Sequence, residues 1–286
     1  MAAVKEPAKA LVTGGTGFIA LELVKQLLEK GYNVRTTVRP GSGPEKLESL
    51  NQLAQVLPGD LEIVEADLLA DKPFHKAVLG VDYVFHLASP FFVKADDPDP
   101  ETSLLKPAVQ GTTNLFEAVV AADEAGHRVR RVVLTSSVAA LKGRSPTQPK
   151  NGKAFTDQDW NETSTIDNGE AYWLSKTLAE KRAWELAEKH GIELATILPD
   201  FVMGPIISAH SLSGSTSRAT PSSQLVAIVQ ERFPSLTIGK GEDDPEDQKR
   251  YPVDPTPARE VLGIHNFTLE ETLTDMARTL IAKGLV

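Results

Sequence analysis

The stretch Thr13-Gly-Gly-Thr-Gly-Phe-Ile-Ala20 carries the strongest indication of the fold. It follows a short apolar run at residues 10–13, typical of a buried strand, and it leads into residues 18–30, whose apolar spacing is typical of a helix. Glycine at position 14 permits a tight turn, and the small side chain of Ala20 permits close packing of helix on strand. A strand, a glycine-rich turn and a helix in this order predict the first unit of a parallel α/β sheet.

Strand-like and helix-like segments alternate through the first 200 residues. Residues 104–125 and 170–190 have the spacing of helices, and short apolar runs lie between the helical segments. Alternation of this kind predicts an α/β fold, a Rossmann-type doubly wound parallel sheet, because parallel strands need right-handed helical crossovers. The expected strands are residues 10–13, 33–39, 61–66, 82–88, 132–136 and 192–199.

The alternation weakens after about Pro205. Residues 208–223 are rich in Ser, Thr and Gly, and residues 239–249 are acidic and polar, so both are expected to be loops. Residues 269–283 have the pattern of an amphipathic helix. We therefore expect a Rossmann-type domain over residues 1–204 and a small C-terminal substrate-binding cap over residues 205–286.

Composition excludes several classes of protein. The 286 residues carry a formal net charge of −9 with no basic block, which argues against nucleic-acid binding. The longest apolar runs are the length of strands, so no membrane span is expected. The absence of cysteine excludes disulfides and thiolate chemistry, and the six scattered histidines have no metal-ligand spacing. We therefore expect no bound metal. Residues 1–9 leave no room for a cleavable signal, which favours a cytoplasmic protein.

The glycine-rich turn also has the spacing of a phosphate-binding loop. Gly17 would let a pyrophosphate approach the backbone, and the helix that begins with Phe18 and Ile19 would face it with free N–H groups. An ordinary strand–helix turn is the alternative. The position of this turn, after the first strand and before the first helix, favours dinucleotide binding.

The end of the second strand distinguishes between two cofactors. An acidic residue there would bind the ribose 2′-hydroxyl of NAD, whereas this chain has Arg39, with Lys46 close behind. Two cations favour the 2′-phosphate of NADP(H), although solvated surface charges are the alternative. After the third strand, Asp67 could accept from the adenine amino group while Leu68 packs on the ring. A helix N-cap at Asp67 is equally compatible with the sequence.

Three side chains predict the chemistry. Tyr172 and Lys176 are four residues apart on one face of a predicted helix, and Ser137 closes the fifth strand at the sheet edge where ligands bind in open α/β folds. A positive Lys176 is expected to lower the pKa of the neighbouring phenol. Tyr172 could then donate a proton while a nicotinamide delivers hydride to a carbonyl that Ser137 orients.

The chain resembles the extended branch of the short-chain dehydrogenase/reductase family, in particular its dihydroflavonol-reductase-like group. The matching runs cover about the first 205 residues in order, among them Thr135-Ser-Ser137, Tyr172-Trp-Leu-Ser-Lys176 and Pro199-Asp-Phe-Val-Met-Gly-Pro205. The resemblance implies a catalytic set of Ser137, Tyr172 and Lys176. It also implies a cofactor-binding set of Thr13, Gly14, Gly17, Phe18, Ile19, Arg39, Lys46, Asp67, Leu68, Leu87, Ala88, Ser89, Tyr172, Lys176, Pro199 and Val202.

The resemblance implies NADPH-dependent reduction of an aldehyde or ketone, a small-molecule substrate, by a monomer or homodimer. Lys142 stands where flavonoid reductases carry an asparagine, and the C-terminal region is shorter than the family's. One alternative is a nucleotide-sugar epimerase or dehydratase of the same family, against which Arg39 argues. The other is a non-enzymatic NADP-binding regulator, against which Tyr172 and Lys176 argue.

Overall fold

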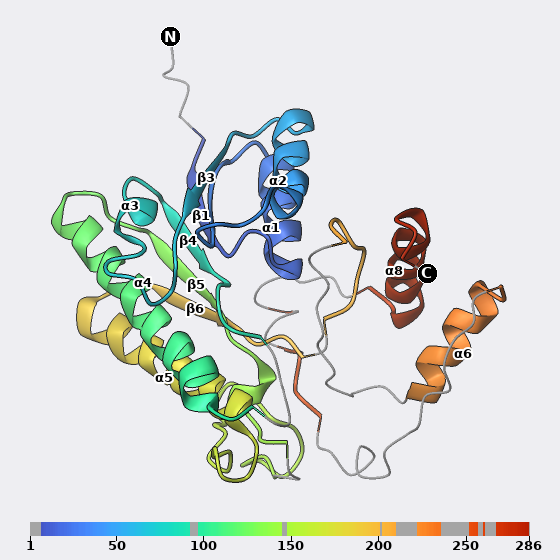
Figure 1. Cartoon of the computed structure of the whole chain (residues 1–286). Helices are drawn as coiled ribbons and strands as arrows, with labels where there is room; N and C mark the ends of the chain where they lie inside the picture. Colours follow the sequence, from blue (N-terminus) through green and yellow to red (C-terminus); the bar gives the residue numbers. More distant parts are fainter. Residues whose placement is uncertain are drawn as a thin grey trace.

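Figure 1 shows the computed structural model of the chain. The structure describes residues 7–91, 97–144, 148–200, 202–209, 222–235, 252–256, 260 and 267–285.

A six-stranded parallel sheet forms the centre of the molecule. The strand order is β3-β2-β1-β4-β5-β6, and every neighbouring pair is parallel. The chain therefore winds outward from β1 in both directions, which confirms the predicted doubly wound fold and places a switch point between β1 and β4. The strands are β1 (Lys9–Thr13), β2 (Asn33–Val38), β3 (Leu61–Glu65), β4 (Tyr83–His86), β5 (Arg131–Thr135) and β6 (Leu194–Ile197).

Helices cover both faces of the sheet (Figure 1). On one face α1 (Phe18–Glu29) and α2 (Pro44–Val56) pack on β1 and β2, in a core that contains Leu28 and Leu50. On the other face the core contains Phe116 and lies beneath the remaining helices. These are α3 (His75–Val78), α4 (Lys106–Glu124) with the preceding π-turn η1 (Glu101–Leu105), and α5 (Ala171–His190).

Several elements differ from the prediction, and two of these differences have clear physical reasons. Helix α2 was not predicted, because Leu50 is its only fully buried residue and its apolar pattern is correspondingly weak. Strand β4 ends at His86, two residues before the predicted end. The N–H groups of Leu87 and Ala88 leave the sheet there and donate to the Thr13 hydroxyl, at 3.0 Å each.

The described residues beyond Pro205 include two helices that pack against each other, α6 (Ser222–Arg232) and α8 (Leu269–Ala282) (Figure 1). Arg232 and Glu270 form an ion pair between them. The Ile206 N–H donates to Thr279 Oγ1 at 2.9 Å, which ties α8 to the segment after β6.

The predicted loops can be compared with the structure only in part. Residues 222 and 223 belong to α6, so the predicted 208–223 loop extended too far, and 210–221 lie outside the described residues. Residues 239–249 also lie outside them. None of the helices in the described ranges is both long and apolar enough to span a bilayer.

Candidate active site

The glycine-rich turn joins β1 to α1 at the carboxyl edge of the sheet. Gly14 has a φ of +73°, and a Cβ on it would lie 3.2 Å from the Ala88 Cα, so glycine is required there for both reasons. No side chain caps α1 at Gly17. The first N–H groups of α1, those of Phe18 and Ile19 among them, therefore point out of the helix end and are available to a ligand.

The Thr13 hydroxyl connects this turn to the end of β4. Its oxygen accepts from two backbone N–H groups and lies 2.9 Å from His86 Nδ1. The hydroxyl proton is therefore donated to Nδ1, and we assign the His86 ring proton to Nε2. Burial, together with the charge of Lys176, lowers the pKa of His86 to about 3, so the ring is neutral. Thr13 itself is fully buried, so its side chain supports the turn from within.

The two predicted phosphate-binding cations lie beyond β2. Arg39 and Lys46 are exposed, and neither forms an ion pair within the described parts of the chain. The Arg39 carbonyl accepts from Ser42 Oγ at 2.8 Å, which holds the turn after β2. Glu65, at the end of β3, accepts from the Gly41 N–H, so a carboxylate that the sequence reasoning missed borders the same turn.

Helix α4 fixes the predicted adenine contact. Asn114 Nδ2 donates to the Leu68 carbonyl at 2.7 Å, and a Cβ on Gly111 would lie 2.5 Å from Leu68 Cδ2. Asp67 Oδ1 accepts from the Leu69 N–H at 2.9 Å in a turn, and no helix begins there, so the alternative of a helix N-cap is wrong. Gly111 and Asn114 were missed because only the folded chain brings them beside Leu68.

The structure brings Ser137, Tyr172 and Lys176 together. Ser137 follows β5 and caps the short helix η2 (Val138–Ala140), and its side chain is hydrogen-bonded to the Tyr172 hydroxyl. Lys176 Nζ lies 5.7 Å from the centre of the Tyr172 ring. Lys176 is buried and, among the described residues, has no hydrogen-bond or ion-pair partner, so its ammonium is available to a bound molecule.

Burial determines how these two groups titrate. It raises the pKa of Tyr172 to about 12, against which the hydrogen bond with Ser137 acts only in part. The expected lowering of this pKa by Lys176 is therefore wrong for the free protein, since the ammonium lies beside the ring and desolvation dominates. Burial also lowers the pKa of Lys176 to about 8. At neutral pH the phenol is protonated and the amine is mostly charged.

Two aromatic rings flank Tyr172. Phe91 meets it edge-on at 5.5 Å between ring centres, and Trp173 does so at 5.7 Å. Phe91 is 40% exposed. The ring of Tyr172 therefore packs against a partly exposed apolar side chain, which the sequence reasoning did not identify because Phe91 is remote from Tyr172 in the chain.

The remaining predicted residues lie along the same sheet edge. The Pro199 carbonyl accepts from the Val138 N–H at 3.1 Å, so the segment after β6 holds η2 and Ser137 in place. Val202 follows in that segment and is half-buried, as are Leu87 and Ser89 after β4. The predicted residues thus come from the ends of neighbouring strands and from α5.

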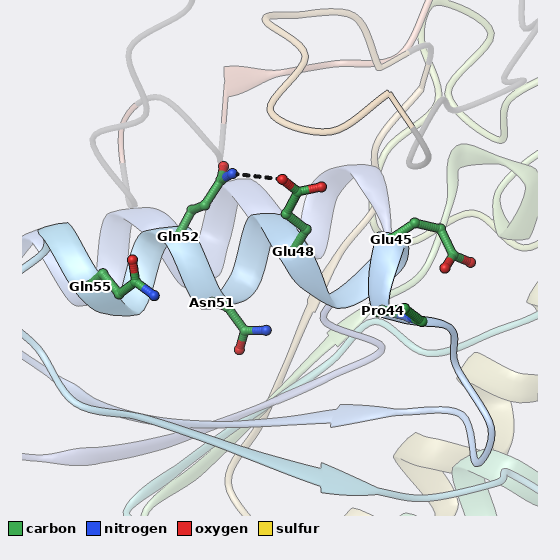
Figure 2. Close-up of a pocket in the computed structure, with 6 residues that line it drawn as sticks. All are labelled: Pro44, Glu45, Glu48, Asn51, Gln52 and Gln55. Carbon is green, nitrogen blue, oxygen red and sulfur yellow. Dashed lines mark hydrogen bonds between the residues drawn. The ribbon is translucent and has the colours of Figure 1, made fainter.

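A separate hollow of about 360 Å³ lies on α2 (Figure 2). All of its lining side chains are exposed, and Gln52 donates to Glu48 across one end. Because it is formed by a single exposed helix and lacks a buried polar group, it has none of the features of a reaction site. It is lined by Pro44, Glu45, Glu48, Asn51, Gln52 and Gln55.

Comparison with known proteins agrees with this geometry. The family model described as "NAD dependent epimerase/dehydratase family" matches residues 10–232. Anthocyanidin reductase of Vitis vinifera is 39% identical over 204 residues, which are 70% of this chain and 57% of that protein. The chain thus spans little more than half of that relative. Tetraketide alpha-pyrone reductase 2 of Arabidopsis thaliana is 36% identical over 238 residues, 80% of this chain and 68% of the relative.

One solved structure is similar to this chain over nearly the whole length of the chain. Gre2 of Candida albicans, in complex with NADPH, has a TM-score of 0.77 at 28% identity, and the match covers 96% of this chain and 99% of Gre2. The chain therefore belongs to the NAD-dependent epimerase/dehydratase family, the extended short-chain dehydrogenases/reductases, within the dihydroflavonol-reductase-like group.

Proposed function

We propose that the chain is an NADPH-dependent carbonyl reductase. The observation that carries the proposal is the hydrogen bond between Ser137 and Tyr172, with Lys176 beside it, whose ammonium has no hydrogen-bond or ion-pair partner among the described residues. The names of the relatives support a reductase, and the Gre2 complex supports NADPH.

The described residues fit this cofactor. Gly14 and Gly17 leave the backbone open, and the uncapped start of α1 can receive the pyrophosphate. Arg39 and Lys46 are cations with no ion-pair partner in the described parts of the chain, and they suit the 2′-phosphate. The Lys176 ammonium suits a ribose hydroxyl. Bound NADPH would supply the hydride.

The residues of the chain would supply the rest of the reaction. Ser137 would donate to the carbonyl oxygen and hold it at Tyr172. The Tyr172 phenol, protonated because its pKa is about 12, would give its proton to that oxygen as hydride arrives at the carbon. The nearby charge of Lys176 would stabilise the resulting phenolate.

The walls of the site indicate a class of substrate. The partly exposed Phe91 ring and the Trp173 ring form an apolar surface against the ring of Tyr172. A bulky or aromatic aldehyde or ketone would bury that surface, which stabilises binding by roughly 25 cal/mol for each Å² removed from water. We propose that residues 205–286, with α6 and α8, form the cap over this substrate.

The test is NADPH oxidation against aliphatic aldehydes, aryl ketones, 1,2-diketones and dihydroflavonols. We expect turnover with at least one bulky or aromatic carbonyl, together with NADPH binding in the absence of substrate. NADPH binding without turnover of any carbonyl would favour a regulator. Tightly retained NAD after purification would favour an epimerase.

A further inference from the structure

A small, partly open cavity lies beside Lys176, on the side of the sheet that α4 and α5 cover, and Ala88 and Ser89 of the predicted cofactor-binding set also line it. Its volume is about 10 Å³, which is about the space that one water molecule needs. Lys176, Glu180 and His86 border it, and Thr112 and Ser136 add hydroxyl groups to its wall. A cavity of this size with several polar neighbours meets the conditions for an ordered internal water.

Glu180 is held rigidly at this cavity. It is 4% exposed, and Ser136 Oγ donates to Glu180 Oε2 at 2.5 Å. Trp184 Nε1 donates to Oε1 at 3.3 Å, and the Thr196 side chain also bonds to this carboxyl group. Burial raises the pKa of Glu180 above its ordinary value, and the three donors, which favour the ionised form, offset this rise only in part.

Tyr172, Lys176 and Glu180 follow one another at intervals of four residues along α5, so they lie on one face of the helix. Lys176 and Glu180 make no direct ion pair, yet both reach the same cavity. His86 has one ring nitrogen bonded to Thr13, and the other, to which we assign the ring proton, has no partner among the described residues. A cation, a carboxylate and a free N–H therefore converge on one small space.

We propose that Glu180 and His86 hold a single water molecule against Lys176, and that the Glu180 carboxylate acts through this water to keep Lys176 charged and aimed at the active site. Glu180 is thus a positioning residue for the proposed reductase, and this inference rests on that function. The Glu180 carboxylate and the Lys176 ammonium would each bond the water, and His86 Nε2–H would donate to it.

The charges around Lys176 determine the direction of the effect. The titratable groups that border it are Tyr172 and Glu180 on α5 and His86 on β4. The cavity walls from α4 and β5 present hydroxyl and apolar side chains, such as Thr112 and Leu134. Burial lowers the pKa of Lys176, and because His86 is neutral, the Glu180 carboxylate would be the anion at this cavity that opposes this effect through the water. Removal of the carboxylate should lower the pKa of Lys176.

The test measures Lys176 directly and needs no turnover. In protein labelled with 15N at lysine Nζ, the Lys176 resonance is assigned by its loss in Lys176→Arg and is then titrated. We expect Glu180→Gln to lower its pKa by about one unit, as is typical for loss of a nearby opposite charge. Glu185→Gln is the matched control, because Glu185 lies on the same helix, is exposed and pairs with Arg182. It should leave the Lys176 pKa unchanged.

A second variant covers the case in which Glu180→Gln does not fold. Ser136→Ala removes one donor from the carboxylate, and it should lower the pKa of Lys176 in the same direction by a smaller amount. A crystal structure at high resolution should show one ordered water in contact with Lys176 Nζ and Glu180. An unchanged Lys176 pKa in a folded variant, or a dry cavity, would overturn the inference. If the wild-type protein reduced no carbonyl, the proposed function would fail. The Lys176 titration would still show whether Glu180 acts on Lys176.

Discussion

Helices α5 and α8 differ in how many of their residues are buried. Of the 20 residues of α5, nine are buried, and these include Lys176 and Glu180. Of the 14 residues of α8, two are buried, although α8 has a clear apolar stripe and a complete capping box at Thr268 and Glu271. Strong helix signals in the sequence thus belong to the less buried helix. Helix α5, which has polar residues on its buried face, carries Tyr172 and Lys176 of the candidate site.

The largest expected effect tests the chemistry assigned to α5. Tyr172→Phe removes the proton donor but keeps the ring between Phe91 and Trp173. We expect kcat to fall by about 10²–10⁴-fold, with the Kd for NADPH unchanged. Tyr83→Phe, on β4, is the control and should keep full activity. Near-normal turnover in Tyr172→Phe would show that another group donates the proton.

The next prediction makes the same change in α8 and in α4, which packs on the sheet beside α5. Leu115→Ala empties a fully buried position on α4, whereas Leu273→Ala removes a side chain on α8 that is 7% exposed. Leucine-to-alanine changes in cores cost about 2–5 kcal/mol. We expect the loss in free energy of unfolding, measured with urea, to lie near the upper end of this range for Leu115→Ala and near the lower end for Leu273→Ala. Equal costs would mean that α8 is packed as firmly as the helices on the sheet.

A third prediction concerns the exposed cations rather than the buried helix. Arg39→Asp should remove most of the preference for NADPH over NADH, since a charge-assisted hydrogen bond contributes roughly 1.5–3 kcal/mol, or about ten- to a hundredfold in affinity. Titration calorimetry with both cofactors measures this ratio. Arg128→Asp makes the same change of charge at another exposed position and should preserve the preference. Equal affinities in the unmodified protein would refute the assignment of Arg39.

The smallest effect is on pH dependence. Burial lowers the pKa of Lys176 to about 8, so the charged form that stabilises the phenolate is lost as pH rises through that value. The kcat/KM for reduction, which reports the groups of the free enzyme, should therefore be constant below pH 7 and be halved near pH 8. The pKa of His86 is about 3, so this group should add no change between pH 6 and 9. A flat profile up to pH 10 would exclude Lys176 as the titrating group.

The parallel sheet was predictable because its signals are local. The turn at residues 13–20 and the alternation of strands and helices predict a doubly wound parallel sheet, and the spacing of Tyr172 and Lys176 places them on one helix face. What the sequence did not reveal depends on contacts over long separations. Ser136 meets Glu180 across 44 residues, and Asn114 meets Leu68 across 46. The expected lowering of the Tyr172 pKa was wrong because it considered the charge of Lys176 without the burial of the phenol.

In the proposed reaction, NADPH bound at this edge of the sheet transfers hydride to a carbonyl carbon. The most direct measurement uses NADPH carrying deuterium at the nicotinamide C4 position that donates hydride, with mass spectrometry of the alcohol product. Wild-type protein should yield alcohol with one deuterium on the former carbonyl carbon, and Tyr172→Phe should yield far less of the same product. Alcohol without deuterium from either C4-labelled epimer of the cofactor would contradict the account.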